Sequence, residues 1–416
     1  MSDTSVDRLA LLGRVSQVFN SSLDLNEVLN TVMDEVIAIT RAERGFVMLK
    51  DEEDCLICRA ARGLDQKDIK GSDFHISRSV VNQVVKDGQP LLTSNAQLDN
   101  RLDNRASVHI LGLLSILCVP LQVKGNTLGA IYVDNRLQTG VFTREDMELL
   151  ATISSSAAIA IENARLYQVA IDKGRLEREL QLAREVQASL IPSSTPQIPG
   201  WEFAATWHPA REVSGDYYDF ITSHPKQPGL VIADVSDKGT PAALFMALTR
   251  SVVRATLSHS VSPAEGITQA NKLICADSTG SMFVTLFYAR LDTHTGEATY
   301  VNAGHNPPLL VRASKEALIE LTRTGMALGV DDSLPYKQQV VRLDPGDLLL
   351  LYTDGITDAI SDNGQEFGLE RLKKLLEDQR GASASEVVAA LEKVVKTHTG
   401  DSAPFDDITI VVVKRI

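Results

Sequence analysis

Residues 230–243 read Leu-Val-Ile-Ala-Asp-Val-Ser-Asp-Lys-Gly-Thr-Pro-Ala-Ala, and this stretch decides the fold of the C-terminal half of the chain. The apolar run is typical of a buried strand, and the glycine and proline that follow it indicate a turn into a helix. Asp234 and Asp237 therefore fall at the end of a strand. Aspartates at strand ends are usually turn formers, so this pair alone does not indicate a functional site.

Three further acidic pairs lie at the ends of apolar strands between residue 200 and the C-terminus: Asp216 with Asp219, Asp354 with Asp358, and Asp406 with Asp407. Carboxylates gathered at one end of a sheet repel one another unless a cation neutralises their charge. Hard oxygen ligands suit Mg²⁺ or Mn²⁺ better than Zn²⁺. We therefore predict a site for two such ions, which together can activate a water molecule and stabilise a phosphoryl group.

The composition is that of a folded, acidic chain of 416 residues, long enough for roughly two or three domains. Hydrophobic residues make up 44%, so the chain can bury sizeable cores. The 41 basic and 54 acidic residues give a formal charge of −13, which disfavours DNA or RNA as the main partner. Four cysteines are too few for a disulfide framework. The polar, acidic N-terminus and the absence of a spanning apolar stretch predict a cytoplasmic protein that does not contact a membrane.

The N-terminal part has an α+β pattern. A helical pattern over residues 28–37 is followed by β-like runs at 45–50 and 55–60, a short helix at 77–85, and two strands that the turn at 124–127 joins. This order predicts a domain at residues 1–148, with an antiparallel sheet and flanking helices.

A long helix is predicted after the capping box at residues 143–146. Apolar or small side chains then recur at heptad spacing, in a first seam of Ile153, Ala157, Ala160, Ala164, Tyr167 and Ile171 and a second seam of Leu176, Leu180, Ala183, Gln187 and Leu190. The five-residue step between the seams breaks the phase beside Gly174. Two interpretations stay open, a coiled coil with a local unwinding point or two ordinary amphipathic helices with a join. Residues 149–191 are therefore predicted to be a helical linker, and residues 200–416 a second domain.

The motifs of the second half resemble a known family. The runs Ser-Gly-Asp-Tyr-Tyr-Asp (214–219), Ala-Asp-Val-Ser-Asp-Lys-Gly (233–239), Asn-Ala-Gly-His-Asn-Pro-Pro (302–308), Tyr-Thr-Asp-Gly-Ile-Thr-Asp (352–358) and Asp-Asp-Ile-Thr-Ile (406–410) are similar, in content and order, to those of bacterial PPM-type (type 2C-like) serine/threonine protein phosphatases of the RsbU/SpoIIE kind. The resemblance implies an αββα sandwich with a dimetal site between two central sheets, and hence an α+β chain overall.

The same resemblance implies roles for individual residues. Asp216 and Asp234 take the positions that bridge two Mn²⁺ or Mg²⁺ ions, and the backbone carbonyl of Val235 contacts one ion. Asp354 and Asp406 are implied as further metal ligands. Asp407 is adjacent to these ligands.

Other positions in the motifs leave alternatives open. Arg211 lies five residues before Asp216, a spacing at which an arginine of similar phosphatases can hold the substrate phosphate, and a surface loop arginine is an equal interpretation. His305 is predicted to be a hydrogen-bonded turn residue rather than a catalytic acid, and the role of His208 stays open. Ser214 is a departure, because the family usually has glycine there.

Residues 1–165 resemble a GAF sensor domain in their order of helix, strands, hairpin and returning helix, with Ala-Glu-Arg-Gly-Phe-Val-Met-Leu (42–49) near the first strand. Asn135, Arg136, Phe142 and Asp146 partly match the pattern of cyclic-nucleotide-binding GAF domains. However, arginine replaces the lysine of that pattern, and Met147 replaces its glutamate. A pocket for another small molecule, or a purely dimeric role, is therefore favoured over cyclic-nucleotide binding.

Together these features predict a signal-regulated phosphatase with a homodimeric linker. It would hydrolyse phosphoserine or phosphothreonine on a partner protein, using a water molecule that two metal ions activate, and the family resemblance suggests an anti-sigma-factor antagonist of the STAS type as that partner. A non-catalytic adaptor that senses a ligand and sequesters a partner is an alternative. It is disfavoured because all the candidate ligand aspartates are present, whereas a domain that had lost catalysis would be expected to lack at least one of them. A two-metal nucleotide cyclase is a third hypothesis, which the motif order disfavours.

Overall fold

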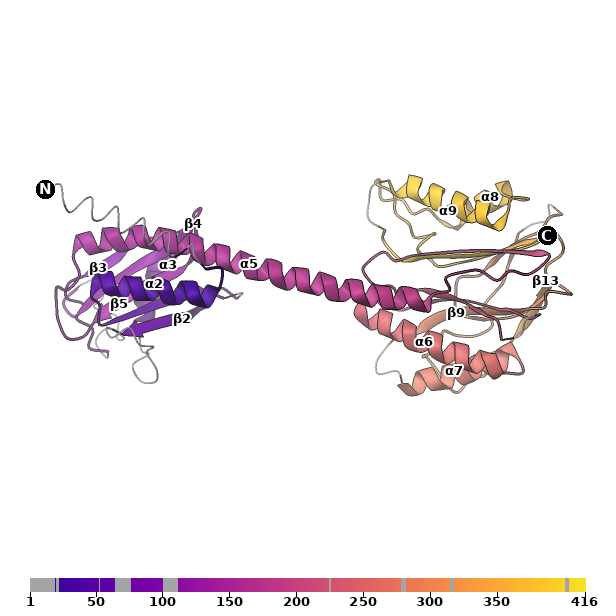
Figure 1. Cartoon of the computed structure of the whole chain (residues 1–416), viewed down its shortest axis with the longest axis horizontal. Helices are drawn as coiled ribbons and strands as arrows, with labels where there is room; N and C mark the ends of the chain where they lie inside the picture. Colours follow the sequence, from indigo (N-terminus) through magenta and orange to yellow (C-terminus); the bar gives the residue numbers. More distant parts are fainter. Residues whose placement is uncertain are drawn as a thin grey trace. The chain divides into compact units, whose positions relative to one another are not determined.

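The computed structural model describes residues 19, 22–51, 53–63, 76–99, 111–223, 226–277, 282–314, 318–400 and 404–416 (Figure 1). The chain divides into two compact units, Met1–Leu176 and Glu177–Ile416. Helices and antiparallel sheets occur in both units, which confirms the predicted α+β class. Among the described residues, no helix is long and apolar enough to cross a membrane.

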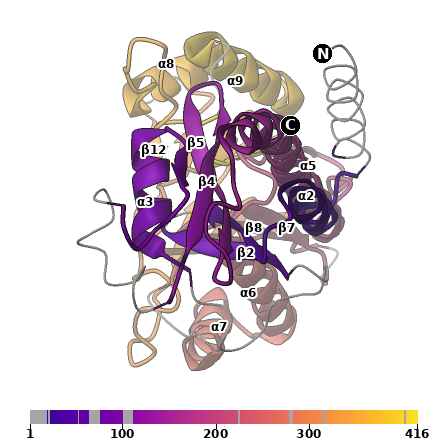
Figure 2. The same cartoon turned by 90° about the vertical axis from the view of Figure 1, so that its left-hand side faces the viewer.

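The N-terminal unit is built on a five-stranded antiparallel sheet in the order β2-β1-β5-β4-β3. Its strands are β1 (Arg44–Lys50), β2 (Leu56–Gly63), β3 (Leu91–Thr93), β4 (Ser115–Val123) and β5 (Asn126–Asn135). Side chains alternate between the two faces. Val47 and Leu49 pack with α2 (Leu25–Thr40) and the beginning of α5 (Arg144–Leu190), whereas Phe46 and Met48 pack with α3 (Arg78–Asp87). Figure 2 shows α3 on one face of this sheet and α2 and α5 on the other.

The helix ends follow local capping chemistry. The Asp24 carboxylate accepts hydrogen bonds from the first backbone amides of α2, and Gly88, at φ 65°, ends α3 in the left-handed conformation. Thr143 Oγ1 accepts from the amide of Asp146, whose carboxylate accepts from the amide of Thr143 at 2.8 Å. This reciprocal pair is the predicted capping box, and α5 begins directly after it.

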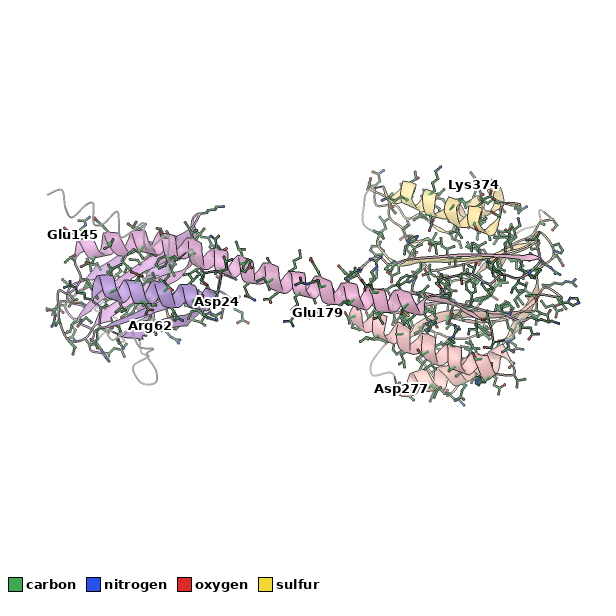
Figure 3. All side chains as sticks on the ribbon, viewed as in Figure 1. Asp24, Arg62, Glu145, Glu179, Asp277 and Lys374 are labelled. Carbon is green, nitrogen blue, oxygen red and sulfur yellow. The ribbon has the colours of Figure 1, made fainter. Side chains whose placement is uncertain are left out.

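The helix α5 is one uninterrupted helix of 47 residues, so neither an unwinding point nor a join interrupts it at Gly174. Of the first predicted seam, Ile153 and Ala157 are completely buried in the core of the N-terminal unit. Gln187 of the second seam is buried within the C-terminal unit. Side chains of the intervening turns are exposed, as Glu179 is (Figure 3). Because of the five-residue step, the buried side chains at the two ends of α5 lie on different faces of the helix. Each end packs within its own unit.

The C-terminal unit contains two five-stranded antiparallel sheets, β13-β10-β9-β8-β7 and β12-β11-β14-β15-β6. Their strands are β6 (Trp201–His208), β7 (Tyr217–Ile221), β8 (Gly229–Val235), β9 (Val284–Leu291), β10 (Glu297–Ala303), β11 (Leu309–Val311), β12 (Ile319–Glu320), β13 (Gln339–Arg342), β14 (Leu348–Tyr352) and β15 (Ile408–Arg415). The helices α6 (Thr240–His259) and α7 (Pro263–Asp277) pack on the first sheet, and α8 (Leu369–Asp378) and α9 (Ala384–Thr399) pack on the second (Figure 1). One apolar core lies between the sheets and one beneath each helix pair, which makes the predicted αββα sandwich.

A buried ion pair lies on the α3 face of the N-terminal sheet. Arg44 donates through Nε and an η-nitrogen to the two oxygens of Asp134, at 2.8 and 2.6 Å. The Asp134 side chain is completely buried. A buried ion pair becomes costly when one partner loses its charge, because the other charge stays out of water.

We predict that Asp134→Asn lowers the free energy of unfolding of the N-terminal unit by about 3 kcal/mol, because it removes the buried negative charge to which Arg44 makes two short hydrogen bonds. Urea unfolding of the whole chain measures the change. Asp54→Asn is the matched control: Asp54 pairs with Lys50 at 3.2 Å but is 83% exposed, so a change below about 1 kcal/mol is expected. Equal changes in the two variants would contradict the prediction.

Candidate active site

The first pair of candidate ligands lies where β7 begins and β8 ends. Asp216 immediately precedes β7, and Asp234 is the penultimate residue of β8. The two strands are antiparallel neighbours with Tyr217 opposite Ala233. Asp216 and Asp234 therefore lie side by side at one end of the first sheet.

The second pair lies at the corresponding end of the other sheet. Asp354 follows β14 by two residues, and Asp406 and Asp407 directly precede β15. These strands are paired, and the amide of Thr353 donates to the carbonyl of Thr409 at 3.1 Å. The Thr409 hydroxyl in turn donates to Asp216 Oδ2 at 2.8 Å, which joins the two sheets. The structure thus brings together all four candidate ligand aspartates, although they are far apart in the sequence.

Burial and mutual repulsion make the carboxylates of this cluster hard to ionise together. Burial raises the pKa of Asp216 well above its usual range, and the charges of Asp234 and Asp407 raise it further. Burial, followed by the charge of Asp354, raises the pKa of Asp234 to about 7. Burial and the charge of Asp406 raise the pKa of Asp354 to about 6. A cation placed among these groups would relieve both effects.

Lys238 supplies part of the positive charge that offsets these carboxylates. Lys238 Nζ lies 2.7 Å from Asp406 Oδ2, and its charge acts to lower the pKa of Asp354. In the ranges that the structure describes, no three His, Cys, Asp or Glu side chains are already arranged around a point that could hold a metal ion. The oxygen donors and their excess negative charge fit Mg²⁺ or Mn²⁺, while the present side-chain conformations form an ion-paired and hydrogen-bonded cluster.

Two glycines allow the close approach of backbone that builds the cluster. A Cβ on Gly355 would overlap the carbonyl oxygen of Asp407, so only glycine lets the Asp354 turn sit against the start of β15. A Cβ on Gly215 would lie 3.2 Å from the carbonyl oxygen of Val235. The Val235 carbonyl, a candidate metal ligand, therefore faces the loop that carries Asp216.

The chain matches two family models. Residues 224–416 match the model described as stage II sporulation protein E (SpoIIE), and residues 24–161 match the GAF domain. A curated relative, the phosphoserine phosphatase RsbU of Bacillus subtilis (strain 168), is 31% identical over 243 residues, which cover 58% of this chain and 71% of RsbU. The chain belongs to the SpoIIE family of protein serine/threonine phosphatases. Phosphatases of this family are metal-dependent.

One further relative and one solved structure show how much of the chain is similar to known proteins. The protein IcfG of Synechocystis sp. is 32% identical over 265 residues, which cover 57% of this chain but only 41% of IcfG. The solved SiaA-PP2C domain of Pseudomonas aeruginosa aligns with a TM-score of 0.54 at 21% identity, over 59% of this chain and 99% of that domain. This second likeness concerns the fold, which is that of a SpoIIE-type PP2C domain.

Asp407 organises the loop that carries Asp216 in this SpoIIE-type domain. Its carboxylate accepts hydrogen bonds from the amide of Ala210 at 2.7 Å, the hydroxyl of Ser214 at 2.7 Å and the amide of Gly215 at 2.9 Å. The Ser214 hydroxyl also accepts from the amide of Asp216 at 3.0 Å. Ser214, the departure from the family pattern, is therefore part of the hydrogen-bond network that positions the ligand loop.

Gln187 is the residue near the site that sequence reasoning missed, because its spacing placed it in a heptad seam. It is 5% exposed. Its side-chain amide donates to the Ser214 carbonyl at 2.9 Å and accepts from the Ser214 amide at 3.0 Å. It also donates to the carbonyl of Ala243 in α6 at 3.3 Å. A polar residue at a seam position was the only sequence signal of this link between α5 and the ligand loop.

Arg211 lies on the same loop, between β6 and β7. Its side chain is exposed and makes no hydrogen bond or ion pair within the part of the chain that the structure describes. The guanidinium is therefore available to a ligand, and the loop that carries it is held by Asp407 through Ala210 and Gly215.

The two histidines have different surroundings. His305 is buried between the sheets, with Nδ1 2.9 Å from the Thr285 hydroxyl and Nε2 3.1 Å from the Tyr352 carbonyl. Burial lowers the pKa of His305 to about 4, so the imidazole is neutral near pH 7 and links the two sheets. His208 is half exposed at the end of β6 and lies 2.7 Å from the carboxylate of Glu392 in α9.

The remaining aspartates of the acidic pairs lie outside the cluster. Asp219 is buried against α6, where both of its oxygens accept hydrogen bonds from Arg254. Asp237 occupies the turn after β8 at φ 72°. Asp358 accepts a hydrogen bond from the Thr357 hydroxyl, and its charge contributes to the raised pKa of Asp354.

The residues of the GAF unit that partly matched a nucleotide-binding pattern have structural contacts. The Asn135 side chain accepts from two backbone amides of the following turn, and Arg136 pairs with Glu43 at 2.8 Å. Phe142 belongs to the core, and Asp146 caps α5. These contacts account for all four residues without a nucleotide.

We predict that Asp234→Asn raises the melting temperature of the metal-free protein at pH 8, because it removes one buried, repelled charge. The sign follows from the raised pKa of Asp234: its contribution to stability is present below the ordinary pKa of an aspartate and is lost as pH rises through about 7. Each kcal/mol of relieved repulsion corresponds to roughly 2–4 °C for a unit of this size. Differential scanning fluorimetry in a chelator measures the shift.

The same variant is expected to lose the stabilisation that added Mn²⁺ gives to the unchanged protein. Asp237→Asn is the matched control, because Asp237 is exposed and asparagine tolerates its left-handed backbone. A lower melting temperature for metal-free Asp234→Asn than for the unchanged protein would contradict the proposed charge repulsion.

Proposed function

We propose that the chain is a signal-regulated phosphatase that hydrolyses phosphoserine or phosphothreonine on a partner protein with the help of two divalent metal ions. The observation that carries the proposal is the convergence of Asp216, Asp234, Asp354 and Asp406 from four strand ends. The raised pKa values of Asp216, Asp234 and Asp354 indicate a cluster with too much negative charge for its degree of burial. A purely structural cluster of turn aspartates would be exposed and would not need this concentration of charge.

The proposed residue roles rest on the family resemblance, and the meeting of the strand ends supports them. Asp216 and Asp234 come from adjacent strands of one sheet and would hold the ions, with the Val235 carbonyl as a further ligand. Asp354 and Asp406 come from the other sheet and would complete the ligand set. When bound, Mg²⁺ or Mn²⁺ supplies Lewis-acid stabilisation of the phosphoryl oxygens and lowers the pKa of a water molecule.

The side chains of this protein would orient the substrate around those ions. Arg211 presents a guanidinium that can bind two phosphate oxygens at once, and the network around Asp407 holds its loop beside Asp216. Lys238 would balance the charge of Asp406 whenever metal occupancy changes. The neutral, buried His305 would support the site structurally, as a hydrogen-bonded link between the two sheets.

The substrate is proposed to be a phosphorylated protein. The name of the relative RsbU, a phosphoserine phosphatase, supports this class of substrate. An anti-sigma-factor antagonist of the STAS type is the specific candidate, which rests on the family resemblance alone. The acidic character of the chain supports a protein partner rather than a nucleic acid.

The GAF domain is proposed to control the site through α5. The two hydrogen bonds between Gln187 and Ser214 connect the last turns of α5 directly to the loop that carries Asp216. A small rotation or shift of this part of α5 would break them and leave buried polar groups unpaired. A small molecule bound in the GAF domain, or the association of two GAF domains, would supply the signal.

The proposed active form is a homodimer that associates along α5. Leu166, Val169 and Leu176 are more than half exposed on this helix, in steps of three and seven residues. A second copy of the same helix would cover them in the manner of a coiled coil. The dimer would then set the rotation of α5 and hence the contacts of Gln187.

We expect Asp354→Asn to lower Mn²⁺-dependent hydrolysis of p-nitrophenyl phosphate, or of a phosphoserine protein, by about a thousandfold or more. The variant removes one metal ligand and with it the electrostatic stabilisation of the phosphoryl group, which is typically the largest part of such catalysis. Steady-state rates with and without Mn²⁺ measure the effect. Glu370→Gln, an exposed change on α8, is the control and should keep full activity.

Isothermal titration with Mn²⁺ separates this proposal from the non-catalytic adaptor. An enzyme of the proposed kind binds Mn²⁺ in a manner that Asp354→Asn weakens, whereas the adaptor shows no carboxylate-dependent binding. Undiminished activity of the Asp354→Asn protein would show that the dimetal assignment is wrong.

The regulatory proposal predicts that the unchanged chain is a dimer at micromolar concentration and that Leu166→Glu with Leu176→Glu makes it monomeric, because like charges would face each other along α5. Static light scattering measures the mass, and phosphatase rates are measured on the same samples. Gln187→Ala should change the rate without changing the mass. Glu179→Gln, on the same helix, should change neither, and a monomeric protein with full activity would exclude this mode of regulation.

A further inference from the structure

A cavity of 430 Å³ opens beside the carboxylate cluster, between α9 and the sheet that contains β15. Its volume is within the range of roughly 300–1,000 Å³ that is usual for ligand pockets. The wall is mainly apolar among the described residues, with contributions from Pro209, Ala359, Val395, Phe405, Ile408 and Ile410. These apolar residues have no part in the metal chemistry proposed above.

The cavity and the cluster share a wall. Asp406, a proposed metal ligand, and Gly355, which follows the ligand Asp354, both line the cavity. A group seated in the cavity is therefore next to the position where the substrate phosphate would bind. In a phosphorylated peptide segment, a residue close in sequence to the phosphorylated one can supply this group.

The charged groups around the cavity already have partners. Glu392 Oε1 accepts a hydrogen bond from the Thr206 hydroxyl at 2.7 Å and lies 2.7 Å from His208 Nε2. Lys396 Nζ donates to the carbonyl of Gly400 at 2.8 Å. A basic side chain that entered the cavity would lose its hydration and find the Glu392 and Asp406 carboxylates already paired. The mainly apolar wall therefore favours an apolar side chain.

Phe405 provides the second observation that points to an apolar occupant. It is 59% exposed, although it directly precedes the ligand Asp406 and borders the cavity. Lys238 Nζ lies 4.6 Å from the centre of its ring and donates to its backbone carbonyl at 2.9 Å, so the residue is held in place from both sides. An anchored but uncovered aromatic ring is typical of a surface that a partner buries.

We propose that this cavity is a specificity pocket, which binds an apolar side chain of the substrate protein next to the phosphoserine or phosphothreonine. The proposal rests on the proposed phosphatase function and adds a sequence preference to it. Binding in the pocket would place the phosphorylated side chain against the cluster, so the preference is expected in kcat/KM of protein and peptide substrates.

The test uses phosphoserine peptides that are identical except for leucine, alanine or glutamate at each residue from three before to three after the phosphoserine. Steady-state hydrolysis by the full chain with Mn²⁺ is compared with that of p-nitrophenyl phosphate, which carries no amino-acid residue beside its phosphate. At the position that enters the pocket, kcat/KM for leucine should exceed that for alanine roughly tenfold or more, and glutamate should be the poorest.

Two variants assign the preference to the cavity. Phe405→Ser and Val395→Ser should reduce the ratio of leucine to alanine towards one; Phe405 is exposed, so its replacement leaves the core intact. Val394→Ser is the matched control, because Val394 is the neighbour of Val395 in α9, is 38% exposed and does not line the cavity. It should keep the ratio of the unchanged protein.

The possible failures can be told apart. Hydrolysis of all peptides without a preference would overturn the pocket and leave the phosphatase function standing. A preference that persists in both Phe405→Ser and Val395→Ser would also overturn the pocket. Absence of hydrolysis of every peptide and of p-nitrophenyl phosphate would overturn the proposed function, and the pocket with it.

Discussion

The repulsion among Asp216, Asp234 and Asp354 is the constraint on which the rest of the C-terminal unit depends. The fold places these carboxylates at the ends of two packed sheets, where burial and neighbouring charge raise the pKa of each. Such a cluster is tolerated only where positive charge and hydrogen-bond donors offset it, and Lys238 and Thr409 supply part of this compensation. Relief of this repulsion would favour the binding of the proposed divalent cations.

The same constraint explains why positioning groups surround the cluster. The loop that carries Asp216 has no regular structure of its own, so the carboxylate of Asp407 and the amide of Gln187 hold its backbone. Asp407 belongs to the sheet sandwich, whereas Gln187 belongs to α5. The loop is thus fixed by one rigid anchor and one anchor on a helix whose other end is buried in the N-terminal unit. In the proposed regulation, a site arranged in this way would respond to movement of α5 while its strands stay in place.

Local patterns were sufficient to predict the mixture of helices and strands and the positions of the aspartates at strand ends, because alternation and turn chemistry act over a few residues. The αββα sandwich was predicted from the family resemblance of the motifs. The partners of α5 could not be predicted in this way. Heptad spacing shows that a stripe is buried but not what covers it, and Ile153 and Ala157 pack against their own sheet. The hydrogen bonds of Gln187 join residues 27 positions apart and those of Asp407 join residues 192 and 197 positions apart, and no local pattern encodes them.

The distribution of charge around the site also constrains which substrates it can accept. A cluster with excess negative charge repels acidic segments until cations neutralise it, and the neighbouring cavity has a mainly apolar wall. In the proposed mechanism, electrostatics would bring the phosphate to the site, but every phosphorylated protein carries that group. Discrimination must come from the shape and the apolar surface next to the site, which Phe405 and the wall beneath α9 provide. Catalysis and selectivity are thus assigned to adjacent surfaces that meet at Asp406.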